Sequence, residues 1–573
     1  MRDSRRPGAL EILRHRPFLY TALTVVLILG YFLWDAVPQA SLDVRDNARP
    51  NDAYAFPKNT KPEVWDQRAE LVRKTFIHAY DGYEEYAAPH DELRPLTNGF
   101  SNKFNGWGVT AVDALDTMLI MKLNAQYSRT LARLSKSTFP MPEGKVAPFF
   151  ETVIRYLGGY LSAYPITQDP ALLKLAEDLA QKLDPAFEQY GKVFPVYGVN
   201  TADGQIQGPE IGFLAEMASL QLEYLYLAKA TGQKRYYDRA RNVIDTLANA
   251  DLRKTGGMLP VSWNLTTGQP HDEHLSVGGR ADSAHEYLLK EYLLTAKTDK
   301  KSLNLYIQTT YRIITDLLYL SPHSPPALRD RNYRQARPHA QDGPPLVLPA
   351  GAARARRAHA PSGRPRLFYP VRRRPRPQGA THPTGLAPDH IIVKTADTKG
   401  IRWIDEVVRW RASSGKRNQT PPGVGERPAA VVYSEQERAT RTGRGRDYAL
   451  RDASYFLRPE TVESLYILWR VTGQSRWREM GWKIFQSIER ETKTPAGYAS
   501  LRTVEVSPGI KEDDMPSFFL AETLKYLYLL FTNADLLPLD RWVFNTEAHP
   551  LPVFEWTGKE RAEFGMAGSE TTP

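Results

Sequence analysis

The sequence predicts an all-α protein whose helices are arranged in pairs around a shared core. From Lys61 onward, apolar residues recur at i, i+3, i+4 and i+7, whereas the alternation typical of strands is rare. A similar hairpin pattern occurs at 229–247 and at 470–488, each with a Thr-Gly-Gln turn and an arginine-rich, aromatic helix start. The clearest helical segments are 111–123, 149–164, 213–232, 281–297, 461–473 and 517–531.

The recurring helical hairpin indicates stacked or ring-closed pairs of helices. Gly, Pro and Asp interrupt the helical pattern, and Gly232 and Gly473 end helices in the two similar hairpins. About a dozen helices of this kind have to share one core, which favours an α/α toroid over a bundle.

The N-terminal region predicts a membrane anchor followed by a stem. Residues 18–34 (FLYTALTVVLILGYFLW) are uncharged and just long enough to cross a bilayer as a helix. Arginines before this run and aspartates after it predict a short cytosolic N-terminus and a luminal remainder. A cleaved signal peptide is the alternative, but no convincing small-residue cleavage site follows. The expected divisions are a cytosolic tail 1–17, a signal anchor 18–34, a stem 35–61, a helical domain 62–555 and a C-terminal tail 556–573.

The positive charge of the chain is concentrated in one internal segment. The formal net charge is +10, and residues 321–390 alone hold 13 arginines, no lysine and three acids. The rest of the chain is close to neutral, so the charge does not indicate a nucleic-acid partner. This segment lacks helical periodicity and is rich in Pro, Arg, Ala and Gly, which is typical of disordered sequence. The chain has no cysteine, which excludes disulfides, cysteine-ligated zinc and a thiol nucleophile.

Carboxylates interrupt the apolar faces of several predicted helices, often with an arginine close by. Burying an acid is costly unless it is paired or functional. Any single pair of an acid and an arginine is explained as a helix-stabilising ion pair, and acids after Pro459 suit an ordinary helix start. The recurrence of such pairs in several apolar helices, however, favours a functional site. The residues are Glu151 with Arg155, Glu216 with Glu223, Arg280 with Asp282 and Glu286, Arg458 with Glu460 and Glu463, and Glu522.

In a ring of helical hairpins, groups near one set of helix ends converge on a central cavity. Carboxylates, arginines and aromatic rings together are what the hydrolysis of a glycosidic bond requires. One carboxylic acid protonates the leaving oxygen and one carboxylate activates water, while arginines and aromatic faces hold the sugar. The pattern therefore predicts a glycosidase.

Taken together, seven motifs resemble the class I α-mannosidases, glycoside hydrolase family 47. They occur in the family's order, and the resemblance covers about 62–320 and 450–555. It implies an (αα)7 barrel that acts as an inverting, calcium-dependent exo-α-1,2-mannosidase and trims high-mannose N-glycans in the secretory pathway. The motifs lie at 76–93, 109–121, 149–164, 278–290, 457–473, 518–531 and 543–552 (VFNTEAHPLP).

Residue by residue, the resemblance implies that Glu151, Asp282 and Glu460 are the three catalytic acids. It also implies that Thr546 holds calcium through its hydroxyl and carbonyl oxygens, with Glu547 beside it. Oxygen ligands and several waters suit that ion. Arg280 resembles the arginine that restricts endoplasmic-reticulum members to one branch. The expected sugar-binding residues are Arg155, Glu216, Arg280, Glu286, Arg458, Glu463 and Glu522.

Segment 321–390 departs from the family. Members carry a helical stretch with a His-Leu pair and a conserved disulfide after a segment like LLYLSP (317–322), whereas here both cysteines are missing. Family-like sequence resumes near 383–393. A slipped reading frame or mis-predicted exon is one interpretation, and a lineage-specific insertion is the other. Sequencing the transcript distinguishes them, because a frame slip would restore a Leu-rich helix with the His-Leu pair and two cysteines.

The functional expectation is a type II membrane protein of the endoplasmic reticulum or Golgi that removes terminal α-1,2-mannose with calcium. Its expected partners are high-mannose N-glycans on glycoproteins and the membrane, with no nucleic acid. A lectin-like or quality-control protein that binds mannose glycans without cleaving them is the alternative from another class. An unrelated α/α-toroid glycosidase acting on glucans is a third. Asn264 and Asn418 begin Asn-X-Thr motifs and are candidate glycosylation sites in a luminal domain.

Overall fold

The computed structural model describes residues 60–188, 193–319, 327–328, 382–393, 402–412 and 448–566. The expected anchor, the stem, Asn418 and most of the arginine-rich segment lie outside these residues. Within the described part of the chain, no helix is long and apolar enough to cross a membrane.

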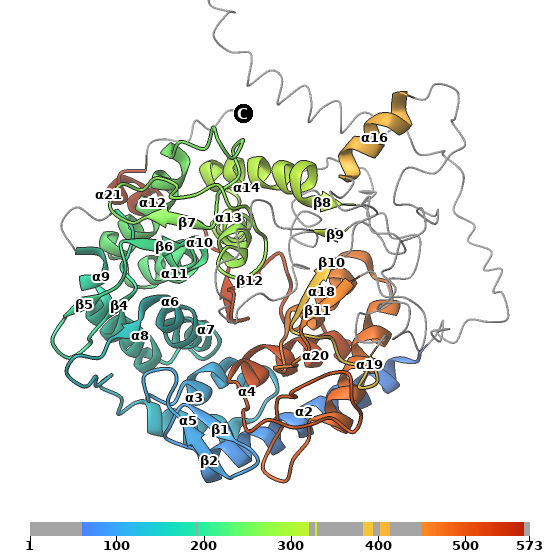
Figure 1. Ribbon diagram of the computed structural model, residues 1–573. Coiled ribbons are helices and arrows are strands. Elements are labelled where there is room, and N and C mark those ends of the chain that lie inside the picture. The colour runs from blue at the N-terminus through green and yellow to red at the C-terminus, as the bar shows by residue number, and fades with distance from the viewer. Residues whose placement is uncertain are drawn as a thin grey trace, which may run out of the picture.

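Helices dominate the structure and lie in a ring, as predicted (Figure 1). Their bounds are α2 Pro62–Tyr86, α3 Val109–Asp113, α4 Leu115–Ile120, α5 Asn124–Leu134, α6 Phe149–Glu151, α7 Gly158–Thr167, α8 Pro170–Leu183, α9 Pro185–Glu188, α10 Leu214–Met217, α11 Gln221–Thr231, α12 Lys234–Asn249, α13 Asp282–Leu294, α14 Lys300–Arg312, α16 Trp403–Ala412, α18 Glu460–Thr472, α19 Arg476–Glu491, α20 Leu524–Phe531 and α21 Gly558–Phe564. Three π-helical turns continue or precede these helices: η2 Thr152–Leu157, η3 Ile313–Leu317 and η5 Phe519–Thr523.

The helices pack in pairs. Among the described residues the pairs are α20 with α2, α4 with α5, α7 with α8, α11 with α12, α13 with α14, and α18 with α19. One member of a pair is buried on nearly all sides, as in α11, where every residue from Gln221 to Ala228 is buried. Its partner α12 is amphipathic and buries Tyr236, Ala240, Val243 and Leu247, which share one face. This division between buried and amphipathic helices is what a two-layered ring requires.

The ring is incompletely described between α14 and α18. In that interval the structure describes a single helix, α16, which packs on η3 and β8. Strands β10 and β11 pair antiparallel in the same interval. The described residues thus account for six helix pairs of an expected seven.

Short strands connect the helices. They are β1 Glu92–Arg94, β2 Gly99–Ser101, β3 Ala147–Pro148, β4 Gly198–Val199, β5 Ile206–Gln207, β6 Ile211–Phe213, β7 Ser262–Asn264, β8 Leu318–Tyr319, β9 Ala327–Leu328, β10 His390–Val393, β11 Tyr448–Asp452, β12 Trp542–Phe544 and β13 Pro550–Pro552. Strands β12 and β13 form an antiparallel hairpin in which Val543 faces Leu551. Because β12 packs on α13 and β13 on α7, this hairpin reaches the middle of the ring (Figure 1).

The C-terminal residues close the ring from outside. Helix α21 packs on α12, where the buried rings of Trp556 and Phe564 lie against Tyr237. The Phe554 backbone N–H donates to the Leu294 carbonyl at 2.9 Å. The expected C-terminal tail 556–573 thus contains a short helix that packs on α12.

The prediction of one helix over 213–232 is wrong in detail, because the chain leaves the helical path between α10 and α11. There the Leu220 N–H donates to the side-chain oxygen of Gln221 at 2.9 Å, and the Ser219 hydroxyl donates to Ser283 at 2.8 Å. One local side-chain hydrogen bond and one tertiary side-chain hydrogen bond thus form where the helical path is interrupted. The predicted segment 111–123 likewise divides at Ala114 into α3 and α4.

Candidate active site

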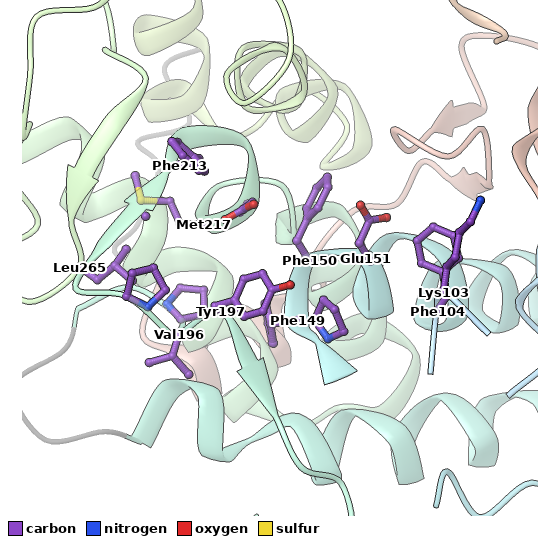
Figure 2. A pocket seen from close by; sticks show the side chains of 15 residues that line it. Lys103, Phe104, Phe149, Phe150, Glu151, Val196, Tyr197, Phe213, Met217 and Leu265 are labelled. Carbon is purple, nitrogen blue, oxygen red and sulfur yellow. The ribbon is translucent and has the colours of Figure 1, made fainter. Parts of the chain in front are cut away.

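A cavity of about 220 Å³ lies beside Glu151. Glu151 and Phe150 project side by side from the start of the α6–η2–α7 helix (Figure 2). Aromatic rings and two carboxylates dominate its wall, which suits a sugar with apolar faces and many hydroxyls. The lining residues are Lys103, Phe104, Pro148, Phe149, Phe150, Glu151, Pro195, Val196, Tyr197, Pro209, Gly212, Phe213, Glu216, Met217 and Leu265.

Arg155 anchors Glu151. It lies one turn later, in the π-helical turn η2, and its Nε donates to Glu151 Oε2 at 2.8 Å. The same buried guanidinium pairs with Glu547 and lies 3.7 Å from Asp113. π-Helical turns inside α-helices are frequent at functional sites. Arg155 therefore joins the first carboxylate of the cavity to two acids from other elements.

Glu216 lines the same cavity as Glu151. Burial and, to a smaller extent, the charge of Glu151 raise the pKa of Glu216 to about 7, against the opposing effect of Arg280. The guanidinium of Arg280 lies 4.3 Å from the centre of the Phe213 ring. The predicted sugar-binding residues Glu216 and Arg280 thus lie together on the side of the cavity formed by β6 and α10.

Arg458 and Glu460, at the start of α18, are not among the residues that line this cavity and form a second wall of the candidate site. The Nε atom of Arg458 donates to Asp389 Oδ1 at 2.5 Å, and a terminal nitrogen lies 4.0 Å from Glu460. Arg458 also interacts electrostatically with Asp282 at the start of α13. Burial raises the pKa of Glu460, while Arg458 opposes the rise. The two other predicted catalytic acids therefore share one arginine.

Further acids reach the same centre from α18 and η5. Burial raises the pKa of Glu522 well above its ordinary value, and the charges of Glu547, Glu460 and Glu463 raise it further. Burial also raises the pKa of Glu463, whose Oε1 lies 3.9 Å from Lys290. The acids predicted from separate helices thus converge.

Glu286 is linked to this group through Lys290, with which it forms an ion pair within α13. The Lys290 ammonium also donates to the Asn545 carbonyl at 3.3 Å. Glu223, in contrast, is fully buried behind the site and bonds Asn545 and Tyr287.

Thr546 and Glu547 lie in the loop between β12 and β13. The Thr546 N–H donates to the Tyr287 hydroxyl at 3.3 Å. Burial raises the pKa of Glu547 to about 8, with Arg155 opposing the rise and Asp113 adding to it. The loop thus inserts one hydroxyl-bearing residue and one carboxylate among the converging acids.

These residues fit a calcium ion bound largely through water. Within the described residues, no three His, Cys, Asp or Glu side chains are arranged to hold a metal directly. Glu463, Glu522 and Glu547 nevertheless share a buried region in which each has a raised pKa, so a divalent cation would relieve their repulsion. Calcium accepts hydroxyl, carbonyl and water oxygens. Thr546 would supply protein oxygens, and the carboxylates would bind the waters.

The sequence prediction missed the charged residues beneath the loop. Asp113 and Asp116 lie on α3 and α4, and His549 ends the β12–β13 loop, all fully buried. Asp113 and Asp116 are acids three residues apart in the apolar segment 109–121. Carboxylates that interrupt an apolar helix were the pattern that predicted the other site residues, so the sequence contained the signal for these two as well. The candidate glycosylation residue Asn264 lies at the end of β7, partly exposed, and its side-chain oxygen accepts N–H groups of Thr266 and Thr267 at 3.0 and 2.8 Å.

A family model for glycosyl hydrolase family 47 matches residues 75–347 and 377–553. The chain belongs to this family. More specifically, it is similar to the class I α-1,2-mannosidases. A mannosyl-oligosaccharide 1,2-alpha-mannosidase of Arabidopsis thaliana is 32% identical over 499 residues, which cover 85% of this chain and 79% of the relative. The endoplasmic reticulum mannosyl-oligosaccharide 1,2-alpha-mannosidase of Homo sapiens is 33% identical over 511 residues, 87% of this chain and 65% of the relative.

A solved family 47-like structure supports the fold. The alpha-1,2-mannosidase from Trichoderma reesei superposes with a TM-score of 0.68 at 25% identity, covering 85% of this chain and 99% of that chain. This likeness supports the expected (αα)7 type of ring. The family match is interrupted between residues 347 and 377, which lie within the expected irregular segment 321–390.

Proposed function

We propose that the chain is an inverting exo-α-1,2-mannosidase that removes terminal mannose from high-mannose N-glycans. The observation that carries the proposal is that carboxylates from different helix pairs belong to one network of interacting charges, and that two of them, Glu151 and Glu216, line an aromatic cavity. Electrostatic interactions link Glu216 to Glu151 and Glu522 to Glu460, and Arg458 links Glu460 to Asp282. Membership of the family, with named mannosidases among the relatives, supports the substrate class.

In this proposal Glu460 is the general base. It removes a proton from a water that attacks the anomeric carbon on the face opposite the leaving oxygen. Its raised pKa suits a group that must accept a proton near neutral pH, and Arg458 orients it. The bond from the anomeric carbon to the leaving oxygen breaks, and inversion gives β-mannose.

Glu151 is the general acid that gives the leaving oxygen its proton. Arg155 fixes one Glu151 oxygen at 2.8 Å, while the carboxylate lines the cavity. Asp282, exposed at the start of α13, binds sugar hydroxyls near Arg458. A calcium ion at Thr546 would supply binding of sugar hydroxyls and stabilise the distorted ring of the transition state.

The test is release of free mannose from a high-mannose N-glycan by the full chain, with and without a calcium chelator. Glu151→Gln should lower the rate about 10²- to 10⁴-fold, because it removes general acid catalysis. Glu188→Gln alters an exposed acid on α9 and is the matched control. Chelator-insensitive trimming would contradict the calcium assignment. Glycan binding without released mannose would favour the lectin-like alternative.

We further propose a type II membrane protein of the endoplasmic reticulum or Golgi. The apolar run 18–34, with arginines before it and aspartates after it, supports this orientation. Expression in cells tests it through Asn264: a glycan on Asn264 slows migration on a gel, and Asn264→Gln abolishes that shift if the domain is luminal. The proposed luminal orientation would be contradicted if the chain migrates without a glycan shift and added protease digests it in intact membranes.

A further inference from the structure

The loop between β12 and β13 is held by one asparagine side chain. Asn545 Nδ2 donates to Glu223 Oε1 at 2.7 Å and to the Ile154 carbonyl at 2.9 Å. Asn545 Oδ1 accepts the backbone N–H groups of Glu547 at 2.9 Å and His549 at 2.8 Å. The amide nitrogen of Asn545 therefore donates two hydrogen bonds and its oxygen accepts two. These bonds join the loop to η2 and α11.

A second series of hydrogen bonds leads from Glu223 through Tyr287 to Thr546. The Tyr287 hydroxyl donates to Glu223 at 2.8 Å and accepts the Thr546 N–H at 3.3 Å. Oε1 of Glu223 thus accepts hydrogen bonds from both Asn545 and Tyr287. Because α11 and α13 are buried on nearly all sides, these partners are rigid.

His549 holds the other end of the loop through buried charges. Its Nδ1 lies 2.8 Å from Asp116 and its Nε2 3.3 Å from Asp113. Burial lowers the pKa of His549, but Asp116 and Asp113 raise it more, to about 9, so both ring nitrogens carry protons at neutral pH. Lys525 completes the cluster at 2.8 Å from Asp116 and donates to the Ala548 carbonyl at 2.7 Å.

The loop also packs tightly on the start of α7. A Cβ atom added at Gly158 would lie 2.7 Å from Asn545 Nδ2 and 3.0 Å from the His549 ring. Such distances leave no room for a side chain, so Gly158 permits the close approach. The loop is thus fixed by hydrogen bonds, charges and contact on one helix.

We propose that Asn545 and Tyr287 are positioning residues that, together with His549, hold Thr546 and Glu547 in the sugar site. Through Glu547 they also hold Arg155, and thereby Glu151, in place. The inference deepens the proposed mannosidase activity and rests on it. Groups that orient active-site residues in this way matter for activity without touching the substrate.

The primary test is Asn545→Asp, which replaces two N–H donors by an oxygen facing Glu223 and the Ile154 carbonyl. We expect kcat to fall about 10- to 100-fold with a smaller change in KM. Hydrogen exchange of a peptide spanning 543–552 should become about 10-fold faster. The control Asn242→Asp makes the same chemical change on outer helix α12, where Asn242 donates to the Val193 carbonyl.

Tyr287→Phe is the second variant, in case Asn545→Asp does not fold. It removes only the hydroxyl between Glu223 and Thr546, so the same two changes should appear at smaller size. The rise in melting temperature on adding calcium is a third readout, because it reports affinity of the folded site. This rise should be smaller in both variants than in the unaltered chain.

A lower melting temperature with unchanged kcat, loop exchange and calcium response would overturn the proposal, since it would make these residues merely structural. Faster loop exchange with unchanged kcat would overturn it too, because the loop position would not matter for the reaction. Failure of the unaltered chain to release mannose would instead overturn the proposed function. The exchange comparison would still decide whether Asn545 and Tyr287 hold the loop.

Discussion

The charges around Arg155 and those around Arg458, which form the two walls of the candidate site, are paired differently. On one wall the Arg155 guanidinium serves three acids, Glu151, Glu547 and Asp113, and its side chain is only 9% exposed. On the other wall Arg458 bonds Asp389 and lies 4.0 Å from Glu460, and its side chain is 24% exposed. The first wall is the more completely buried and connected.

Different elements surround the two arginines. Arg155 lies among α3, η2 and the β12–β13 loop, which pack on described helix pairs. Asp389, the partner of Arg458, directly precedes β10. Among the described residues, Arg155 thus has more charged partners than Arg458. We expect the first wall to contribute more to stability.

The largest effect is expected for Arg155→Met. Removing the guanidinium leaves buried carboxylates without their cation, so the free energy of unfolding should fall by about 3–5 kcal/mol. Urea unfolding followed by circular dichroism measures this change. The control Arg253→Met removes an exposed arginine that, among the described residues, pairs with Asp251 alone, and it should have little effect. Equal losses in the two variants would contradict the account of the first wall.

A pH effect of about 3 kcal/mol is expected from Glu223 behind the first wall. Burial raises its pKa from 4.5 to about 7. Below pH 4.5 the acid is protonated in both states. As the pH rises towards 7 only the unfolded state loses the proton, so the stabilising contribution is progressively lost.

Glu223→Gln keeps an acceptor for Asn545 and Tyr287 and removes this titration. Its free energy of unfolding should therefore decline less steeply between pH 5 and 7 than that of the unaltered chain. Urea unfolding at several pH values provides the comparison, with Glu188→Gln as the exposed control. Parallel curves for the unaltered chain and Glu223→Gln would show that Glu223 titrates normally.

Arg458→Met should cost less than Arg155→Met. It removes one strong charged hydrogen bond, to Asp389, so the expected loss is about 1.5–3 kcal/mol. The same urea experiment measures it. A loss greater than that of Arg155→Met would reverse the proposed ranking of the two walls.

Arg280→Leu is expected to change product distribution more than stability. Its guanidinium lies against Phe213, beside Glu216, and its fixed hydrogen-bond donors can select the hydroxyls of one branch. Chromatography of the trimmed glycans over time should show a broader set of products. The proposed branch selection fails if the variant and the unaltered chain give the same products in the same order.

Local patterns in the sequence predicted much of the fold and part of the site. The pair Glu151 and Arg155 was predicted on one helix face, and the structure forms that ion pair, because i and i+4 residues are neighbours on a helix. Helices α11, α13 and α18 likewise follow from the apolar periodicity of their segments. Such features depend on residues close in sequence.

Contacts between distant segments were not predictable in this way. Glu547 meets Arg155, and Asp389 meets Arg458, only because the ring brings separate elements together. The interruption between α10 and α11 also depends on a distant partner, Ser283 on α13. Tertiary contacts therefore override the apolar periodicity of segment 213–232.

In the proposed function, carboxylates that converge in one helical ring hydrolyse an α-mannoside by direct attack of water. Proton NMR of the first mannose that the full chain releases from a high-mannose N-glycan tests this mechanism. We expect β-mannose to appear first and then to equilibrate with the α-anomer, because a single displacement inverts the anomeric carbon. Initial release of α-mannose, or no release, would contradict it.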